Sequence, residues 1–252
     1  SVYDTGGNGT FAEEVVDVSG ELKLCNFRLS FTDLEVPVTG IPITLTRTYD
    51  TLTSNNEYEF GYGWRMEFRD ADLRTSLGRD EQYEDFGIRS QAFDDNTKVY
   101  ITLPGGNRQA FEFEPIGDPI NRYIYGAESA KFYNPGFKAI GDTESTLSLK
   151  LKASDELENG PLNRTTRINR QQDGTYRGNF SPYNPADPYF GVEYVLTTKE
   201  GIAYIIDPTT GKINEVRDTN DNRLYFTDEA VTSSTGKKIT FERDAYGRIT
   251  SV

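Results

Sequence analysis

Apolar and polar residues alternate along most of this chain with the two-residue period of a half-buried β-strand. The clearest run covers residues 41–49, where Ile41, Ile43, Leu45, Arg47 and Tyr49 share one face. A β-strand points successive side chains to opposite faces, so the run predicts a strand with one largely apolar face. The opposite face carries proline and threonine: Pro42, Thr44, Thr46 and Thr48.

The same alternation predicts strands on both sides of this run. Val99, Ile101 and Leu103 precede Pro-Gly-Gly-Asn at 104–107, and Phe111 and Phe113 follow it, which predicts a β-hairpin. Upstream, the apolar phase changes near Cys25-Asn26, where we expect a bulge or a bend between the Leu22–Leu24 and Phe27–Phe31 runs. Downstream strands are expected at the following residues: Leu147, Leu149, Leu151, Tyr194, Leu196, Tyr204, Ile206, Leu224, Phe226, Ile239 and Phe241.

Helical periodicity is restricted to a short candidate turn at residues 154–160. We therefore expect an all-β fold of antiparallel sheets built from β-hairpins, with long loops and little helix. The stretch 115–192 is rich in proline, asparagine and aromatic residues, and its Asn-Pro and Asp-Pro pairs indicate turns. It is interpreted as a loop-rich insertion that follows an N-terminal extension (1–19) and a β-domain (20–114).

A six-residue segment recurs near the C-terminus. Gly-Lys-Ile-Asn-Glu-Val at 211–216 returns as Gly-Arg-Ile-Thr-Ser-Val at 247–252, an offset of 247 − 211 = 36 residues. A repeat of this length indicates stacked supersecondary units, so residues 193–252 are expected to be β-hairpin repeats. Because the second copy ends the sequence, we expect further repeats or a partner β-sheet at this C-terminal edge.

Composition narrows the function classes. The chain has 252 residues, with 27 basic and 40 acidic side chains and a net charge of −13, which argues against nucleic-acid and anionic-membrane partners. It has no histidine and one cysteine, Cys25, which excludes imidazole bases, histidine-ligated metals and a disulfide framework. No apolar run is long enough to insert in a membrane, and no cofactor is expected.

Two segments together resemble the Rhs/YD-repeat family, which includes polymorphic-toxin shells and the teneurin barrel. Arg-Thr-Tyr-Asp at 47–50 and Gly-x-Gly-Trp at 61–64 resemble its N-terminal motifs, including Arg47, Tyr49, Asp50, Gly61, Gly63 and Trp64. Asp244, Gly247 and Arg248 match the repeat unit, and Asp207–Ile213 matches it with lysine in place of arginine. The resemblance covers about residues 20–68 and 193–252.

This resemblance implies that residues 193–252 are YD-type repeats and that 20–114 form the Rhs-like N-terminal β-domain. Family members spiral their sheet into a hollow shell that encloses a toxin or presents a surface, and the resemblance implies that this chain is a secreted or cell-surface bacterial protein. The chain departs from the family pattern in two respects. It holds too few repeats to close a shell alone, and it lacks the Asp-Pro-rich self-cleaving core.

Arg47 and Trp64 each allow a functional and a structural interpretation. As ligand groups, the guanidinium would bind an anion or sugar and the indole would stack on a sugar ring. In the structural interpretation, Arg47 pairs with a carboxylate or backbone carbonyls and stacks on Tyr49 or Trp64. Trp64 would then anchor the core, with positive φ at Gly61 or Gly63. We favour the structural interpretation.

Two further groups are candidates for ligands. Asp218, Asn220 and Asn222 place oxygen ligands at alternating positions, as calcium loops do, although the same residues also form Asx turns. Tyr183, Tyr189 and Phe190 make the best aromatic ligand surface, with a self-packed Ω-loop as the alternative. We expect the turn for the first group.

Taken together, the sequence predicts a non-enzymatic structural segment that initiates or closes a β-shell around cargo or presents a surface. An adhesin-like module is the alternative, and it would bind a cell-surface glycan or protein through the aromatic insertion. A glycoside hydrolase is the third hypothesis, because the chain has many carboxylates that could form an acid–base pair.

Overall fold

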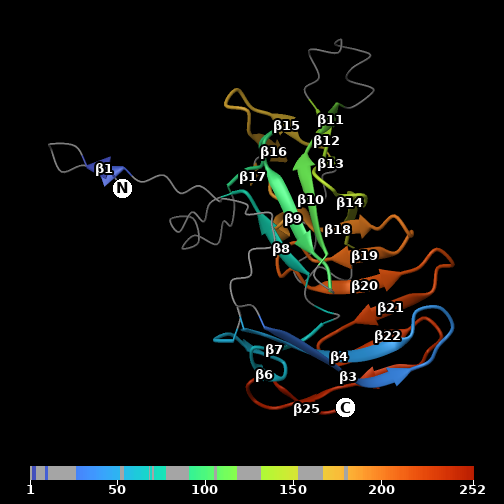
Figure 1. Cartoon of the computed structure of the whole chain (residues 1–252). Helices are drawn as coiled ribbons and strands as arrows, with labels where there is room; N and C mark the ends of the chain where they lie inside the picture. The colour runs from blue at the N-terminus through green and yellow to red at the C-terminus, as the bar shows by residue number, and fades with distance from the viewer. Residues whose placement is uncertain are drawn as a thin grey trace.

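The computed structural model describes residues 2–3, 9–10, 27–51, 54–67, 69, 71–77, 91–104, 107–117, 132–152, 167–178 and 181–252. The chain is nearly all β, in open antiparallel sheets, which confirms the predicted fold class (Figure 1). Helical structure in these residues is represented by the 3₁₀ turn η4 (Pro188–Phe190). The bulge expected at Cys25-Asn26 and the turn expected at 154–160 lie outside the described residues.

The largest sheet has seven strands in the order β14-β18-β19-β20-β21-β22-β23. Its inner face carries the apolar residues of the alternating pattern, and one row crosses the sheet from Leu147 through Leu196 and Tyr204 to Val216 and Leu224. The strands are β14 (Thr146–Leu151), β18 (Val192–Thr197), β19 (Ala203–Ile206), β20 (Ile213–Arg217), β21 (Arg223–Phe226), β22 (Ala230–Ser233) and β23 (Lys238–Thr240).

This sheet does not coincide with the range 193–252 expected for the repeats. It begins at β14, inside the stretch interpreted as an insertion, and its ladder ends at β23. β23 ends at Thr240, and the Phe241 N–H still donates in register to Glu229 O before the chain turns into β24. The two copies of the repeated segment therefore lie in different sheets: the first forms β20, and the second forms β25 (Ile249–Ser251), which pairs with β24 (Glu242–Arg243).

One turn geometry recurs between these C-terminal strands. In four turns the first residue donates its N–H to the carbonyl of the fifth, and the fourth donates back to the first. The fourth residue has positive φ each time: Gly201, Asp221, Gly236 and Gly247. Glycine adopts this conformation without a Cβ penalty, so Asp221 is the exception among the four.

A second sheet faces the first and has the order β13-β10-β9-β8. Its central pair is the hairpin predicted from the alternation around residues 99–113, with Ile101 opposite Gln109 and Val99 opposite Phe111. β13 contacts β14 of the first sheet, and the Phe137 ring of β13 lies 5.6 Å from the Tyr194 ring of β18. The strands are β8 (Asp72–Thr75), β9 (Lys98–Thr102), β10 (Arg108–Phe113) and β13 (Phe137–Ala139).

The third main sheet has the order β3-β4-β7 and includes the Arg-Thr-Tyr-Asp strand. β4 runs beside the large sheet and contacts β22 (Figure 1). A bulge interrupts the β3–β4 register between Thr32 and Leu34, beyond the phase change at Cys25-Asn26. The strands are β3 (Arg28–Val36), β4 (Ile43–Asp50) and β7 (Trp64–Met66).

Short strands complete the described fold. They form pairs or a triplet of strands. Their bounds are β1 (Val2–Tyr3), β2 (Gly9–Thr10), β5 (Glu57–Tyr58), β6 (Gly61–Tyr62), β11 (Ile116–Gly117), β12 (Tyr133–Asn134), β15 (Asn169–Arg170), β16 (Tyr176–Gly178) and β17 (Ser181–Pro182).

A single cluster of buried side chains joins these sheets. It extends from Ile43 and Met66 in the third sheet, through Phe113 in the second, to Leu196 and Phe241 near the C-terminus. The stretch 115–192 contributes to the same cluster, through residues such as Ile168 and Tyr176. Burial of apolar surface in one continuous cluster is the main term that holds the sheets together.

Candidate functional site

The two copies of the repeated segment both bind the N-terminal part of the chain. We define the docking segment as the described residues from Ser54 to Thr75. The Ile213 N–H donates to Arg69 O at 2.8 Å, and the Ile249 N–H donates to Glu59 O at 2.7 Å. These isoleucines occupy the same position in the two copies, so the docking segment is recognised twice through the backbone.

The first of these contacts is a short antiparallel ladder. Besides the bond from Ile213 to Arg69, the Ala71 N–H donates to Gly211 O at 3.1 Å. A Cβ added to Gly211 would lie 2.9 Å from Ala71 O, and Gly211 has φ +71°. Glycine is therefore required here by both the close approach and the backbone conformation.

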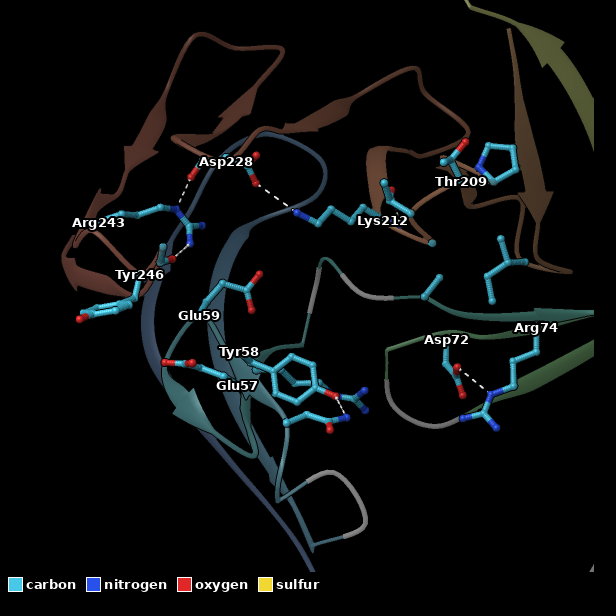
Figure 2. A pocket seen from close by; sticks show the side chains of 18 residues that line it. Glu57, Tyr58, Glu59, Asp72, Arg74, Thr209, Lys212, Asp228, Arg243 and Tyr246 are labelled. Atoms are coloured by element: carbon cyan, nitrogen blue, oxygen red, sulfur yellow. Dashed lines mark hydrogen bonds and ion pairs between the residues drawn. The ribbon is translucent and has the colours of Figure 1, made fainter. Parts of the chain in front are cut away.

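Asp228 connects the docking segment to the first copy and to Arg243 of β24, which precedes the second copy (Figure 2). Its carboxylate lies 2.5 Å from Arg69 Nη1 and 3.3 Å from Lys212 Nζ, while its backbone carbonyl accepts from Arg243 Nε at 2.7 Å. Partial burial raises the pKa of Asp228, but the Arg69 and Lys212 cations outweigh it and hold that pKa below its usual range. The β21–β22 connection therefore joins three segments that are distant in sequence.

Arg248 of the second copy reinforces its own turn. Its guanidinium pairs with Asp244 at 2.7 Å, lies over the Tyr246 ring, and reaches Glu57 of the docking segment at 4.0 Å. Asp244 Oδ1 also accepts from the N–H groups of Tyr246 and Arg248. These hydrogen bonds and the Arg248 charge lower the pKa of Asp244.

The N-terminal motif residues form an aromatic cluster at the surface. Arg47 pairs with Asp33, and its guanidinium lies over Trp64 at 5.7 Å and Phe60 at 5.9 Å, the kind of arrangement expected in the structural interpretation. Trp64 packs against Tyr49 and Phe31. Phe31 is 47% exposed and Trp64 is only half-buried, so the prediction that Trp64 anchors the buried core is wrong.

The two glycines before Trp64 have positive φ, as the motif predicts: +101° at Gly61 and +72° at Gly63. At Gly63 an added Cβ would lie 2.7 Å from the Tyr49 ring and 2.9 Å from Ser54 Cα. The Gly63 carbonyl also accepts the Asp50 N–H at 3.2 Å. Tight packing at Gly63 thus fixes the loop that follows β4 against the start of β7.

The calcium candidate forms a turn. Asp218 Oδ1 accepts from the N–H groups of Asn220 and Asn222, and Oδ2 accepts from the Asn222 side-chain amide at 2.7 Å. Asp218 therefore has the same role as Asp244 in its turn, although Asp221 replaces the glycine and conceals the similarity in the sequence. Within the described residues, no group of three or more acidic, cysteine or histidine side chains could hold a metal ion.

The proposed aromatic ligand surface is wrong for two of its three residues. Tyr183 is 1% exposed and Phe190 is fully buried; the Tyr183 ring packs against Phe93 and Phe113, and the Phe190 ring packs against Tyr183. Burial raises the pKa of the Tyr183 hydroxyl well above its usual value. Tyr189 is half-buried and contacts Phe190. The sequence could not show this packing, because it joins segments about ninety residues apart.

A polar cleft of about 970 Å³ lies between the docking segment and the two copies. Figure 2 shows Glu59 pointing into it, with Lys212, Asp228 and Arg243 on the opposite wall. Three runs of consecutive residues line most of it: Asn56–Glu59, Ala71–Arg74 and Pro208–Lys212. Sequence reasoning did not find this cleft, since it arises only when the N-terminal segment meets the C-terminal turns.

A family model for a domain of unknown function (DUF6531) matches residues 25–78. This range contains β3 to β8, and with them the Arg-Thr-Tyr-Asp strand, the Gly-x-Gly-Trp segment and the docking segment. None of the curated proteins compared with the chain matches it. Among the helices formed by described residues, none is long and apolar enough to cross a membrane.

Proposed function

We propose that this chain is a non-catalytic structural segment of a large secreted or cell-surface bacterial protein of the Rhs/YD-repeat kind. In this proposal its N-terminal β-domain initiates or closes one end of a β-shell. Further repeats, or a partner sheet, extend the wall, and the shell encloses cargo or presents a surface.

The observation that carries this proposal is the double docking of the repeated segment. The same N-terminal segment accepts a backbone hydrogen bond from Ile213 in the first copy and from Ile249 in the second. A segment that receives successive repeats acts as a template for their spacing, in the way that capping units terminate repeat arrays. This is the behaviour expected at the start of a wall.

The polar groups at this junction support a structural role. The Asp228 carboxylate pairs with Arg69 and Lys212, and its backbone carbonyl accepts from Arg243. Arg243 also donates to Gly247 O. The Arg69 side chain is only 7% exposed, so its charge depends on this pairing. Removing one partner of a buried ion pair leaves the other uncompensated and costs stability.

Asp228→Asn tests the junction. We expect unfolding free energy to fall by about 1–3 kcal/mol, less than for a fully buried pair because the Asp228 side chain is itself 60% exposed. Glu229→Gln, at the exposed neighbouring residue, removes the same charge and serves as the control. Equal stability of the two variants in urea unfolding would show that the Asp228 junction contributes nothing specific.

The proposed shell is tested with the full reading frame that encodes the chain and with its protein product. We expect it to continue past Val252 with many repeats, and the longer product to form closed particles by electron microscopy. Deleting the docking segment from that product should give open or aggregated forms. A stop codon directly after Val252, or closed particles that form equally well without the segment, would contradict the proposal.

A further inference from the structure

The cleft runs along strand edges rather than across a sheet face. Successive residues of a strand point their side chains to opposite faces, so only the backbone edge can present four neighbours to one space. Ala71 to Arg74, at the start of β8, line the cleft consecutively, and Asn56 to Glu59, around β5, line the opposite side in the same way. The run along β8 therefore presents a backbone edge to the cleft.

The phase of β8 shows which backbone groups are free. Ala71 donates its N–H away from β9, to Gly211 O, whereas Ser76 donates to Lys98 O in β9. Alternate residues of a strand point their amides the same way, so Leu73 and Thr75 direct theirs toward the cleft side. β8 is the edge strand of its sheet, and no hydrogen bond to Leu73 or Thr75 from that side occurs within the described part of the chain.

The ladder on this edge stops although the edge continues. Gly211 and Ile213 pair with Ala71 and Arg69, but the next residue in register, Thr209, donates its N–H to Asp207 Oδ1 instead. The turn at 207–211 thus leaves β8 at Leu73. An additional extended strand could continue from that point, as peptides do when they add to an exposed sheet edge.

The cleft also holds uncompensated polar groups. Glu59 Oε2 is shielded from solvent and has no hydrogen-bond partner within the described residues, and the same is true of Arg243 Nη2. Glu59 points into the cleft in Figure 2, and its Oε2 atom has no partner among the described side chains. One oxygen of the half-buried Glu59 carboxylate thus has no partner, and a basic group that reaches this carboxylate would form a charge-assisted hydrogen bond with it.

We propose that this cleft binds an extended peptide segment that carries a basic side chain. The segment adds as a strand to the edge of β8 at Leu73 and Thr75, and its lysine or arginine pairs with Glu59. The net charge of −13 attracts such a basic partner over distance. This proposal concerns a separate chain and does not depend on the shell described above.

The test uses two fluorescein-labelled peptides on the whole chain. One is acetyl-Thr-Lys-Val-Thr-Val-Lys-Thr-amide, and the other has glutamate in place of both lysines. We expect the basic peptide to bind at least about tenfold more tightly by fluorescence anisotropy, a ratio that corresponds to about one charge-assisted hydrogen bond. Equal or undetectable binding of the two peptides would overturn the proposal.

Two variants distinguish binding in the cleft from a general effect of the protein's negative charge. Glu59→Gln should weaken the basic peptide about tenfold, whereas Glu229→Gln, which removes the same charge from an exposed site, should change it less than about twofold. Two peptides N-methylated at alternate residues test the strand geometry, because the isomer that loses the edge-facing N–H groups should not bind. Equal weakening by the two variants, or full binding of both methylated isomers, would overturn the proposal.

A structural readout accompanies these affinities. In two-dimensional ¹H–¹⁵N NMR spectra, titration with the basic peptide should shift the amide signals of Leu73 and Thr75. It should leave the signals of Asp142 and Gly236, in exposed turns elsewhere, unchanged. Shifts confined to other segments would overturn the assignment to β8.

Discussion

Glycine at position 63 shows how a single residue fixes the N-terminal motif. Its φ of +72° and its contacts with Tyr49 and Ser54 leave no room for a side chain. Gly63→Ala should therefore cost the left-handed backbone penalty of about 1–2 kcal/mol and a further steric term. Gly141→Ala is the matched control, because Gly141 has φ +61° but no neighbour within 4 Å of an added Cβ. Equal losses in urea unfolding would mean that the packing around Gly63 is unimportant.

Substitutions of Tyr183 distinguish a role in the core from a role in ligand binding. Its ring is buried, and its hydroxyl has no hydrogen-bond partner within the described residues. Tyr183→Phe should therefore leave the melting temperature unchanged or raise it, while Tyr183→Ala should cost about 3–5 kcal/mol. A large loss in the phenylalanine variant would show that the hydroxyl has a partner in solution.

Asp207 links two strands through charge. It pairs with Lys152 at 2.7 Å and accepts from the N–H groups of Thr209 and Thr210. Burial raises the pKa of Asp207, but the bonds from Lys152, Thr209 and Thr210 outweigh it and bring the folded-state pKa below the ordinary value. The turn after β19 is thus tied to the end of β14.

The sign of the pH effect follows from that lowered pKa. A carboxyl with a depressed folded pKa contributes its full stability above its unfolded pKa of about 4, and this contribution is lost as the pH falls through the folded pKa. Asp207→Asn should lower unfolding free energy at pH 7 by about 1–2 kcal/mol and flatten its decline in acid. The exposed Asp142→Asn should change neither property, and an unchanged acid limb in the Asp207 variant would contradict this account.

Strands with one apolar face were predictable from the sequence because burial imposes the two-residue period. Leu147, Leu196 and Leu224 lie on the inner face of one sheet, as their alternation predicts. The docking contacts were not predictable, because backbone carbonyls such as Arg69 O and Glu59 O carry no residue-specific signal. Trp64 was misplaced for a related reason. Its partners, Phe31 and Tyr49, lie on the part of the β3-β4-β7 sheet that is outside the buried cluster.

At the scale of the whole molecule, the last strands protect an edge. Deleting residues 236–252 removes β23, β24 and β25, and it uncovers β22 and the side chains packed by Ile239 and Phe241. An open apolar edge promotes association, so the shortened chain should form oligomers in multi-angle light scattering and melt at a lower temperature. Removal of Val252 alone should have no such effect. A deletion product that is monomeric and equally stable would contradict the proposed role of these strands.

The central claim is that the N-terminal docking segment and the seven-stranded sheet form one cooperative unit. Trp64 is the only tryptophan of the chain and lies beside the docking contacts, so its fluorescence reports on this segment alone, whereas far-ultraviolet circular dichroism reports on all the sheets. Urea unfolding followed by both signals is the most direct test. We predict coincident transitions with one midpoint, shifted together to lower urea in Asp228→Asn. A Trp64 transition at clearly lower urea, with the dichroism unchanged there, would contradict the account.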